Sequence, residues 1–478
     1  MQQASVGCRA VPATGRAMIP ASTRSTQAGV GQPPSSAGSW VADHRGSLFL
    51  TIFVWLQIFN LAVPLDIIFE PREVQLQLET AMAVNPVARA IKIATLLIVA
   101  GMVVWRYRLV AALLRRTNEY FLAFTALILF SVSWSIDPGA TSARFVTWIT
   151  YVGICVSFSV ASWHPRRFQE VTRSIITLIL IGSIIFGLAA PDLAIEQGDG
   201  TLKNSWHGLT RQKNQFGQLA GFGTVFWLHA WASRETKWLP AVLGITLSWT
   251  CVFLSRSSTS LMATVFVFQF FMLSLRAPPS LKRYMPYLII TFSALIITYA
   301  IAVLKLVPGM DVLLEPIAAA TGKDLTFSNR SVIWEIIKEH VQLAPMLGSG
   351  YGAYWTGPNP WSPSYVFLGR MWFYPTESHN GYIEVVNDLG FVGLLCLLGY
   401  LIAYVRDSLR LMRIDRNQGA LFLGLFFLQA IMNLSESTWL QTNASFIFLI
   451  MTLATVSLAR ALLEAELRQA FASGSEGS

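Results

Sequence analysis

A small set of basic residues stands where the chain could bind a charged ligand. Arg211 and Lys213 come directly before an apolar block that begins near 214, and Arg256 lies in a short polar stretch between two later blocks. Arg330 begins an amphipathic segment. A guanidinium group is a planar fork that matches phosphate oxygens bidentately. Together these cations favour an anion-binding site, although each one alone also fits an interfacial anchor.

His379 adds a group that can accept a proton. It lies in ESHNGYIEVVNDLG, where Asn380, Glu384 and Asp388 recur at the helical spacing of four. Histidine changes its charge between about pH 5 and pH 8, so it suits a general base. Carboxylates inside an apolar span are costly without partners, which makes Glu384 and Asp388 functional candidates. The alternative is a histidine that only caps a helix.

The elements that must position these residues are transmembrane helices. The chain is 54% hydrophobic and only 13% charged, whereas soluble domains carry about 25% charged residues. Its apolar residues form blocks of about 20, the length that crosses a bilayer. We predict an all-α, polytopic bundle of about twelve spans. They are expected near 47–69, 88–106, 119–136, 142–163, 171–190, 214–233, 238–254, 259–275, 285–306, 381–405, 419–434 and 441–462.

The placement of charge orients this bundle. A net charge of +9 could indicate a nucleic-acid partner. However, Lys and Arg gather in alternate short loops, around 106–116, 166–167, 234–237, 276–283 and 406–416. Short cytoplasmic loops retain positive charge in this way. We therefore predict no nucleic-acid partner, cytoplasmic N- and C-termini, and a candidate site on the outer face of the membrane, away from the basic loops.

The chain divides by composition into five parts. Residues 1–45 are rich in Ser, Gly, Pro and Ala and predict a disordered cytoplasmic tail. Spans one to nine occupy 46–306, a large outer loop occupies 307–380, spans ten to twelve occupy 381–462, and a second cytoplasmic tail occupies 463–478. The loop contains several Trp and Tyr residues. We therefore expect it to fold against the bundle.

Within this loop, Ser331–Val341 predicts a short amphipathic helix along the outer interface. Asn329 or Ser328 could cap its start, and His340 is expected to face water. The glycine-rich LGSGYGAYW that follows lacks the context of a phosphate loop. It favours a tight turn whose backbone approaches a substrate or another helix. The sequence contains no metal-ligand motif, so we predict chemistry without a metal or other cofactor.

Four stretches in order resemble the O-antigen ligase and Wzy-type polysaccharide polymerase superfamily. They are HGLTRQKNQFG at 207–217, LSRSSTS at 254–260, NRSVIWEII at 329–337, and LGSGYGAYW followed by ESHNGYIEVVNDLGFVG. The resemblance covers about 200 to 440, whereas the first five spans resemble the family only in hydropathy. It implies a GT-C type glycosyltransferase of the bacterial inner membrane that transfers a glycan from undecaprenyl pyrophosphate to an acceptor sugar on the periplasmic side. The loop at 307–380 would then be periplasmic.

The resemblance also implies roles for individual residues. Arg211 and Arg256 would hold the pyrophosphate, and His379 would act as the base or orient the acceptor. Arg330 matches a Gly-Arg-x-x-x-Trp-like motif, but Asn329 replaces the usual Gly and leaves its role less defined. The predicted catalytic residues are His379, Arg211 and Arg256. The predicted substrate-binding residues are Arg211, Lys213, Asn214, Arg256, Arg330, Asn380, Tyr382 and Glu384.

Several alternatives stay open at this point. Polymerisation of exopolysaccharide or O-antigen repeat units is preferred to ligation onto lipid A core, although the two reactions share a donor and differ only in the acceptor. A transporter or flippase for lipid-linked oligosaccharide would need a polar path at the midplane. A non-catalytic scaffold would tolerate alanine at Arg211 and Arg256. Expected partners are the bilayer, the lipid-linked donor, the acceptor and other polysaccharide assembly proteins.

Overall fold

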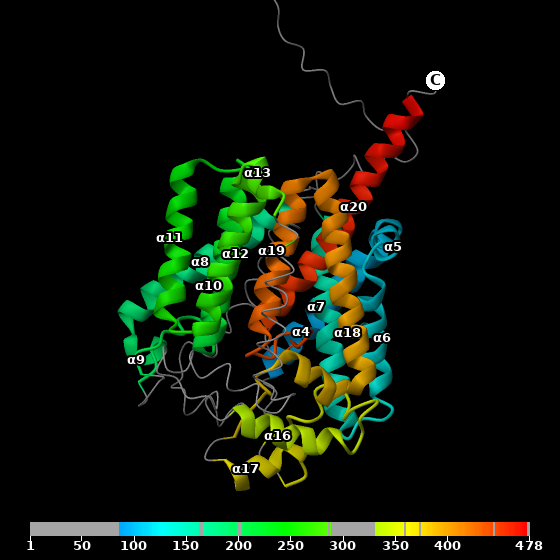
Figure 1. Cartoon of the computed structure of the whole chain (residues 1–478). Coiled ribbons are helices and arrows are strands. Elements are labelled where there is room, and N and C mark those ends of the chain that lie inside the picture. The colour runs from blue at the N-terminus through cyan, green and yellow to red at the C-terminus, as the bar shows by residue number, and fades with distance from the viewer. Residues whose placement is uncertain are drawn as a thin grey trace, which may run out of the picture. The chain divides into compact units, whose positions relative to one another are not determined.

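Helices make up the fold that a computed structural model gives for this chain (Figure 1). The structure describes residues 86–161, 166–197, 203–284, 287, 330–357, 360–371, 374–442 and 445–475, all of which belong to one unit formed by residues 44–478. Over these ranges the only strand-like pairing is an isolated bridge between Ile195 and Trp206. The predicted all-α class is therefore confirmed for the part of the chain that is described.

The first half of the described chain contributes α4 (Pro86–Trp105), α5 (Tyr107–Leu114), α6 (Glu119–Ser131), α7 (Pro138–Ala161), α8 (Arg167–Ala189), α9 (Pro191–Ala194), α10 (Lys213–Ala232), α11 (Trp238–Leu254), α12 (Ser258–Phe271), η2 (Met272–Arg276) and α13 (Pro279–Lys282). The second half contributes α16 (Arg330–Val341), η4 (Pro363–Val366), α17 (Phe367–Arg370), α18 (Gly381–Ile414), α19 (Arg416–Met432) and α20 (Ser445–Ser475).

Each predicted span that falls on described residues coincides with a helix. By length and apolar composition, five of the described helices could cross a membrane. They are α7, α8, α12 together with η2, α18, and the part of α20 that runs from Phe446 to Arg468. A sixth span results if α4 and α5, whose axes meet at 91°, form one broken span. The apolar helices α6 and α11 are shorter.

Other predicted elements fall on residues that the structure does not describe. The predicted spans at 47–69 and 285–306 lie outside the described residues, apart from residue 287, as does the predicted tail at 1–45. The number of twelve spans therefore stays a prediction. In the region predicted as a C-terminal tail, α20 continues as helix to Ser475.

Helix α10 lies among α8, α11, α12 and α19. Its glycines let it approach its neighbours closely, because a Cβ atom at Gly217 would come within 2.6 Å of Ser260 Oγ. Small residues at helix contacts have this effect in membranes. The close packing fixes the start of α10, and therefore the residues around Arg211, against α12 and α19.

Helix α18 is broken at Gly390, whose φ of 62° and ψ of −163° are not helical. The segment before Tyr351 bonds to the break: the Phe391 N–H donates to the Pro345 carbonyl at 2.9 Å, and the Gly350 N–H donates to the Asp388 carbonyl at 2.9 Å. A Cβ atom at Gly348 would lie 2.6 Å from the Asp388 backbone. The predicted close approach of this glycine turn to a helix is thus confirmed, and it satisfies backbone groups that the break exposes.

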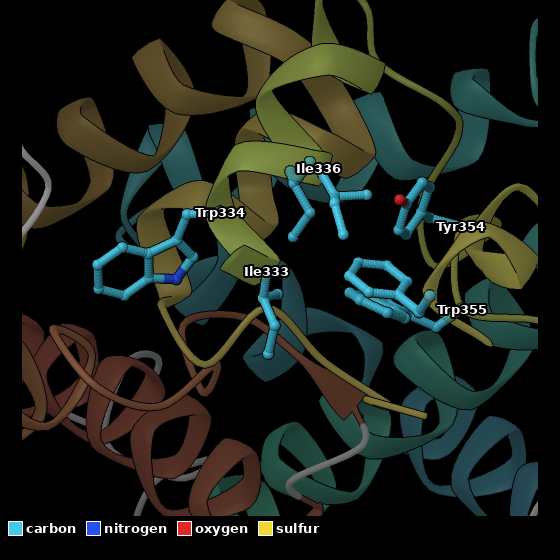
Figure 2. Close-up of a cluster of buried hydrophobic side chains, with 7 residues drawn as sticks. Ile333, Trp334, Ile336, Tyr354 and Trp355 are labelled. Carbon is cyan, nitrogen blue, oxygen red and sulfur yellow. The ribbon is translucent and has the colours of Figure 1, made fainter. Parts of the chain in front are cut away.

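Helix α16 confirms the predicted amphipathic segment, and in Figure 1 it lies with α17 near the end of the bundle where α18 begins. Its apolar side packs into a small core rather than standing alone (Figure 2). This outer core consists of Ile333, Trp334, Ile336, Ile337, Tyr354, Trp355 and Phe367. The proposed caps, Asn329 and Ser328, lie outside the described residues.

Candidate functional site

His379 lies in a turn directly before α18, beside two carboxylates. Its Nδ1 atom is 3.3 Å from Glu377 Oε1 and 4.0 Å from Glu436 Oε2. Glu377 shares the turn, whereas Glu436 comes from the connection between α19 and α20. The His379 backbone has a φ of 54°, in the left-handed region that non-glycine residues rarely adopt. The predicted base therefore lies beside the carboxylates of Glu377 and Glu436, in a backbone conformation that the surrounding structure must hold.

Glu436 joins His379 to the start of α16. Its Oε1 atom accepts hydrogen bonds from Arg330 Nη2 at 3.0 Å and from Asn214 Nδ2 at 2.7 Å. Only 3% of the Glu436 side chain is exposed, compared with 19% for Arg330. A buried carboxylate needs such partners to remain charged. We call Glu377, His379, Glu436 and Arg330 the His379 cluster.

Burial and charge act in opposite directions on the two carboxyl groups of this cluster. Burial raises the pKa of Glu436 above its ordinary value, and the charge of Glu377 adds to this effect against the opposing charge of Arg330. Burial also acts to raise the pKa of Glu377, but the neighbouring His379, with Gln212 and Arg330, lowers it overall. The carboxylate of Glu377 is therefore the one better suited to stabilise a positively charged imidazole.

The first turn of α10 and the residue before it reach the same cluster. Gln212 Nε2 donates to Glu377 Oε1 at 3.3 Å, and Asn214 bonds Glu436 as described above. Arg211 and Lys213 are the residues next to these two in the chain, and Arg211 is exposed. The structure thus brings the predicted RQKN stretch to His379, although the two are far apart along the chain.

Arg256 occupies a different setting, in the connection between α11 and α12. It is exposed, has a φ of 50°, and its Nη1 atom donates to the Lys203 carbonyl at 3.0 Å. It borders an open groove of about 500 Å³ lined by Asn204, Trp206, Thr250, Phe253, Leu254 and Arg256. A cation at the edge of a largely apolar groove suits an amphiphilic anion.

Asn380 and Tyr382, both predicted to bind substrate, make contacts within the protein. Asn380 caps α18, since its Oδ1 atom accepts from the N–H groups of Tyr382 and Ile383 at 3.0 and 3.1 Å. It is 1% exposed. The Tyr382 hydroxyl lies 3.5 Å from the Ala430 carbonyl. Their contact with substrate stays a prediction, but the cap shows what Asn380 does for the fold.

Glu384 and Asp388 are both buried and bonded. Glu384 Oε1 accepts from Trp355 Nε1 at 2.7 Å, and its Oε2 accepts from the Ser378 N–H at 2.7 Å. Asp388 Oδ2 accepts from Gln441 Nε2 at 3.3 Å. Both carboxylates therefore have hydrogen-bond partners within the protein, which lowers the cost of burying them. Binding of substrate by Glu384 stays a prediction.

Sequence reasoning missed Gln212, Glu377 and Glu436. Glu377 stands two residues before His379, and Glu436 lies in a short connection between two apolar helices. An ionisable residue in such a connection is a signal that could have identified Glu436. Nothing in the sequence shows that it contacts Arg330, which is 106 residues away.

Three side chains of the His379 cluster bear on the prediction of metal-free chemistry. Ligand atoms of Glu377, His379 and Glu436 lie within 4.8 Å of one another, a spacing that could hold a metal ion. Arg330 already places a positive charge on Glu436. Metal independence therefore stays a prediction.

The expectation that His340 faces water is wrong. Its Nε2 atom lies 2.7 Å from Ser349 Oγ, and its ring is 4.7 Å from that of Tyr354. Burial lowers the pKa of His340 from its ordinary value. The residue falls on the side of α16 that meets the glycine turn, which the apolar stripe alone did not indicate.

Comparison with known proteins finds two similarities. Residues 243–398 match the family model described as O-antigen ligase. Over 332 residues the chain is 26% identical to the exopolysaccharide production protein ExoQ of Rhizobium meliloti (strain 1021), covering 67% of this chain and 73% of that relative. The matched domain contains Arg256, Arg330 and His379. With its long apolar helices, the chain is a multi-pass membrane protein, and both similarities support the predicted resemblance to the O-antigen ligase and Wzy-type polysaccharide polymerase family.

Proposed function

We propose that the chain transfers a glycan from undecaprenyl pyrophosphate to a sugar hydroxyl, and that it polymerises exopolysaccharide or O-antigen repeat units. The observation that carries this proposal is the His379 cluster, in which the Nδ1 atom of His379 lies near two carboxylates and Gln212, the neighbour of Arg211, bonds one of them. The relative named for exopolysaccharide production supports the choice of product.

In the proposed reaction, an acceptor hydroxyl oxygen attacks the anomeric carbon of the donor sugar. The bond from that carbon to the pyrophosphate oxygen breaks, and undecaprenyl pyrophosphate leaves with the electron pair. The proton of the hydroxyl passes to His379 Nε2, while Glu377 beside Nδ1 stabilises the resulting imidazolium. A general base of this kind contributes about 10²–10⁴-fold. A single displacement inverts the anomeric centre.

Arginine side chains would stabilise the leaving group. Arg211 and Arg256 are both exposed, so an incoming pyrophosphate can reach them. The apolar groove beside Arg256 would accept the first part of the polyprenyl tail. Removing one such donor from a charged transition state costs about 3 kcal/mol in known enzymes. Lys213 and Asn214 would contribute to the same face.

Ligation onto lipid A core is the alternative within the family, because it uses the same kind of donor. Purified protein should be given an undecaprenyl-pyrophosphate oligosaccharide, with and without lipid A core, and the products analysed by mass spectrometry. Growth of the lipid-linked glycan is expected. Transfer only to lipid A core would replace polymerase by ligase, and no turnover with an intact donor would refute both.

We also propose that the site faces the periplasm of the inner membrane, with cytoplasmic termini. The support is the distribution of Lys and Arg along the chain. Single cysteines introduced at exposed Arg256 and at exposed Arg406 should react on opposite sides of the membrane with an impermeant maleimide. Labelling of both from the same side would refute this orientation.

A further inference from the structure

The turn that carries His379 is held by groups from distant parts of the chain. Trp334 Nε1 donates to the Ser378 carbonyl at 2.9 Å, and the Ser378 N–H donates to Glu384 Oε2 at 2.7 Å. Trp355 Nε1 donates to Glu384 Oε1 at 2.7 Å. Ser378 is therefore fixed through both its N–H and its carbonyl, directly before His379.

A further contact closes the turn from the chain beside Glu436. Ser437 Oγ lies 3.3 Å from Glu384 Oε2 and accepts the N–H of Asn380 at 3.1 Å. Ser437 is the neighbour of Glu436 in the chain. The carboxylate of Glu384 therefore contacts both the turn that carries His379 and the connection that carries Glu436. Such support is needed because His379 has a positive φ.

Both indoles belong to the outer core. Figure 2 shows Ile336 on the side of α16 that faces Tyr354 and Trp355, while Trp334 leaves the helix on another side. Trp334 and Trp355 are 9% and 6% exposed. Packing therefore fixes each indole. The Trp334 N–H then holds the turn directly, and the Trp355 N–H holds it through Glu384.

We propose that Glu384, with Trp334 and Trp355, positions His379 for the reaction. This inference rests on the proposed function of His379 as the base. Glu384 is 2% exposed and both of its oxygens accept protein hydrogen bonds, so it acts through the turn. The outer core is then a platform for the catalytic turn.

The test compares full-length Glu384→Gln and Trp355→Phe with the wild type. A glutamine offers one acceptor oxygen where Glu384 uses two, and phenylalanine removes only the indole donor. Each change should lower kcat by about tenfold, as expected for loss of a hydrogen bond to a charged group, with KM nearly constant. Deuterium uptake at residues 377–380 should rise.

Trp134→Phe is the matched control, because Trp134 Nε1 donates to the Leu347 carbonyl, outside the hydrogen bonds of Ser378 and Glu384. It should change neither kcat nor exchange at 377–380. Unchanged exchange and kcat in folded Glu384→Gln and Trp355→Phe would overturn the inference. Deuterium exchange needs no substrate, so it can be measured even if the wild type shows no glycan transfer. In that case, faster exchange in the variants would support the role of Glu384 in holding the turn, while the missing transfer would refute the proposed function.

Discussion

The His379 cluster and the Arg256 groove differ in how their charges are held. In the cluster, Arg330 and Glu436 bond each other at 3.0 Å and are mostly buried. At the groove, Arg256 is exposed and bonds a backbone carbonyl. Preorganised groups suit a proton transfer that recurs at one place, whereas an exposed cation suits a ligand that arrives and leaves. Under the proposed function, the buried cluster would take the proton of the acceptor, and the exposed Arg256 would hold the donor.

The largest effect is expected for His379→Ala. Loss of the base should lower kcat by about 10²–10⁴-fold with a smaller change in KM. The measurement is glycan growth on the lipid-linked donor, with thermal unfolding as a control for folding. A kcat within a few-fold of the wild type would move the proton transfer away from the cluster.

Arg256→Ala should weaken the donor side. We expect kcat/KM for the lipid-linked donor to fall by about 10²-fold, since a donor of charged hydrogen bonds to the leaving group is lost. Arg256→Lys should recover only part, because it lacks the planar fork. Normal kinetics for Arg256→Ala would leave the groove without a role in the reaction.

Arg330→Ala should distinguish the regions by stability. It leaves Glu436 buried beside Glu377 without its cation, which should cost about 3 kcal/mol of folding free energy. Arg256→Ala, at an exposed position, should leave unfolding nearly unchanged. Denaturant or thermal unfolding in detergent measures both, and equal losses would contradict the contrast between buried and exposed cations.

A smaller effect concerns pH and the outer core. Burial lowers the pKa of His340, so the unfolded chain binds a proton at this residue more readily than the folded chain does. The stability it contributes is full above the unfolded pKa of about 6.5 and is lost as the pH falls through the lowered value. His340→Gln should flatten this acid loss in thermal unfolding. An unchanged pH profile would show that His340 is not its source.

The smallest effect is expected for metal removal. With Arg330 supplying positive charge to Glu436, EDTA should leave turnover unchanged. The control is addition of Mg²⁺ or Mn²⁺ after chelation. Activity that disappears with EDTA and returns with the ion would instead make Glu377, His379 and Glu436 a metal site.

Much of the fold followed from local properties of the sequence. Apolar blocks predicted α11 at Trp238–Leu254 and the start of α18 at Gly381, because the length of an apolar block determines whether a helix can cross a bilayer. The stripe at 332–341 predicted α16 for the same local reason. Similarly, the order of the motifs along the chain was enough to indicate the resemblance to O-antigen ligases, which the comparisons support.

The tertiary structure alone decided which charges meet. Asn214 is 222 residues from Glu436 in the chain and Arg330 is 106 residues from it, yet both donate to the same carboxylate oxygen. The break at Gly390 likewise depends on hydrogen bonds from a distant loop. Sequence periodicity reports which face of a helix is apolar, but partners across helices are set by packing, which no single segment encodes.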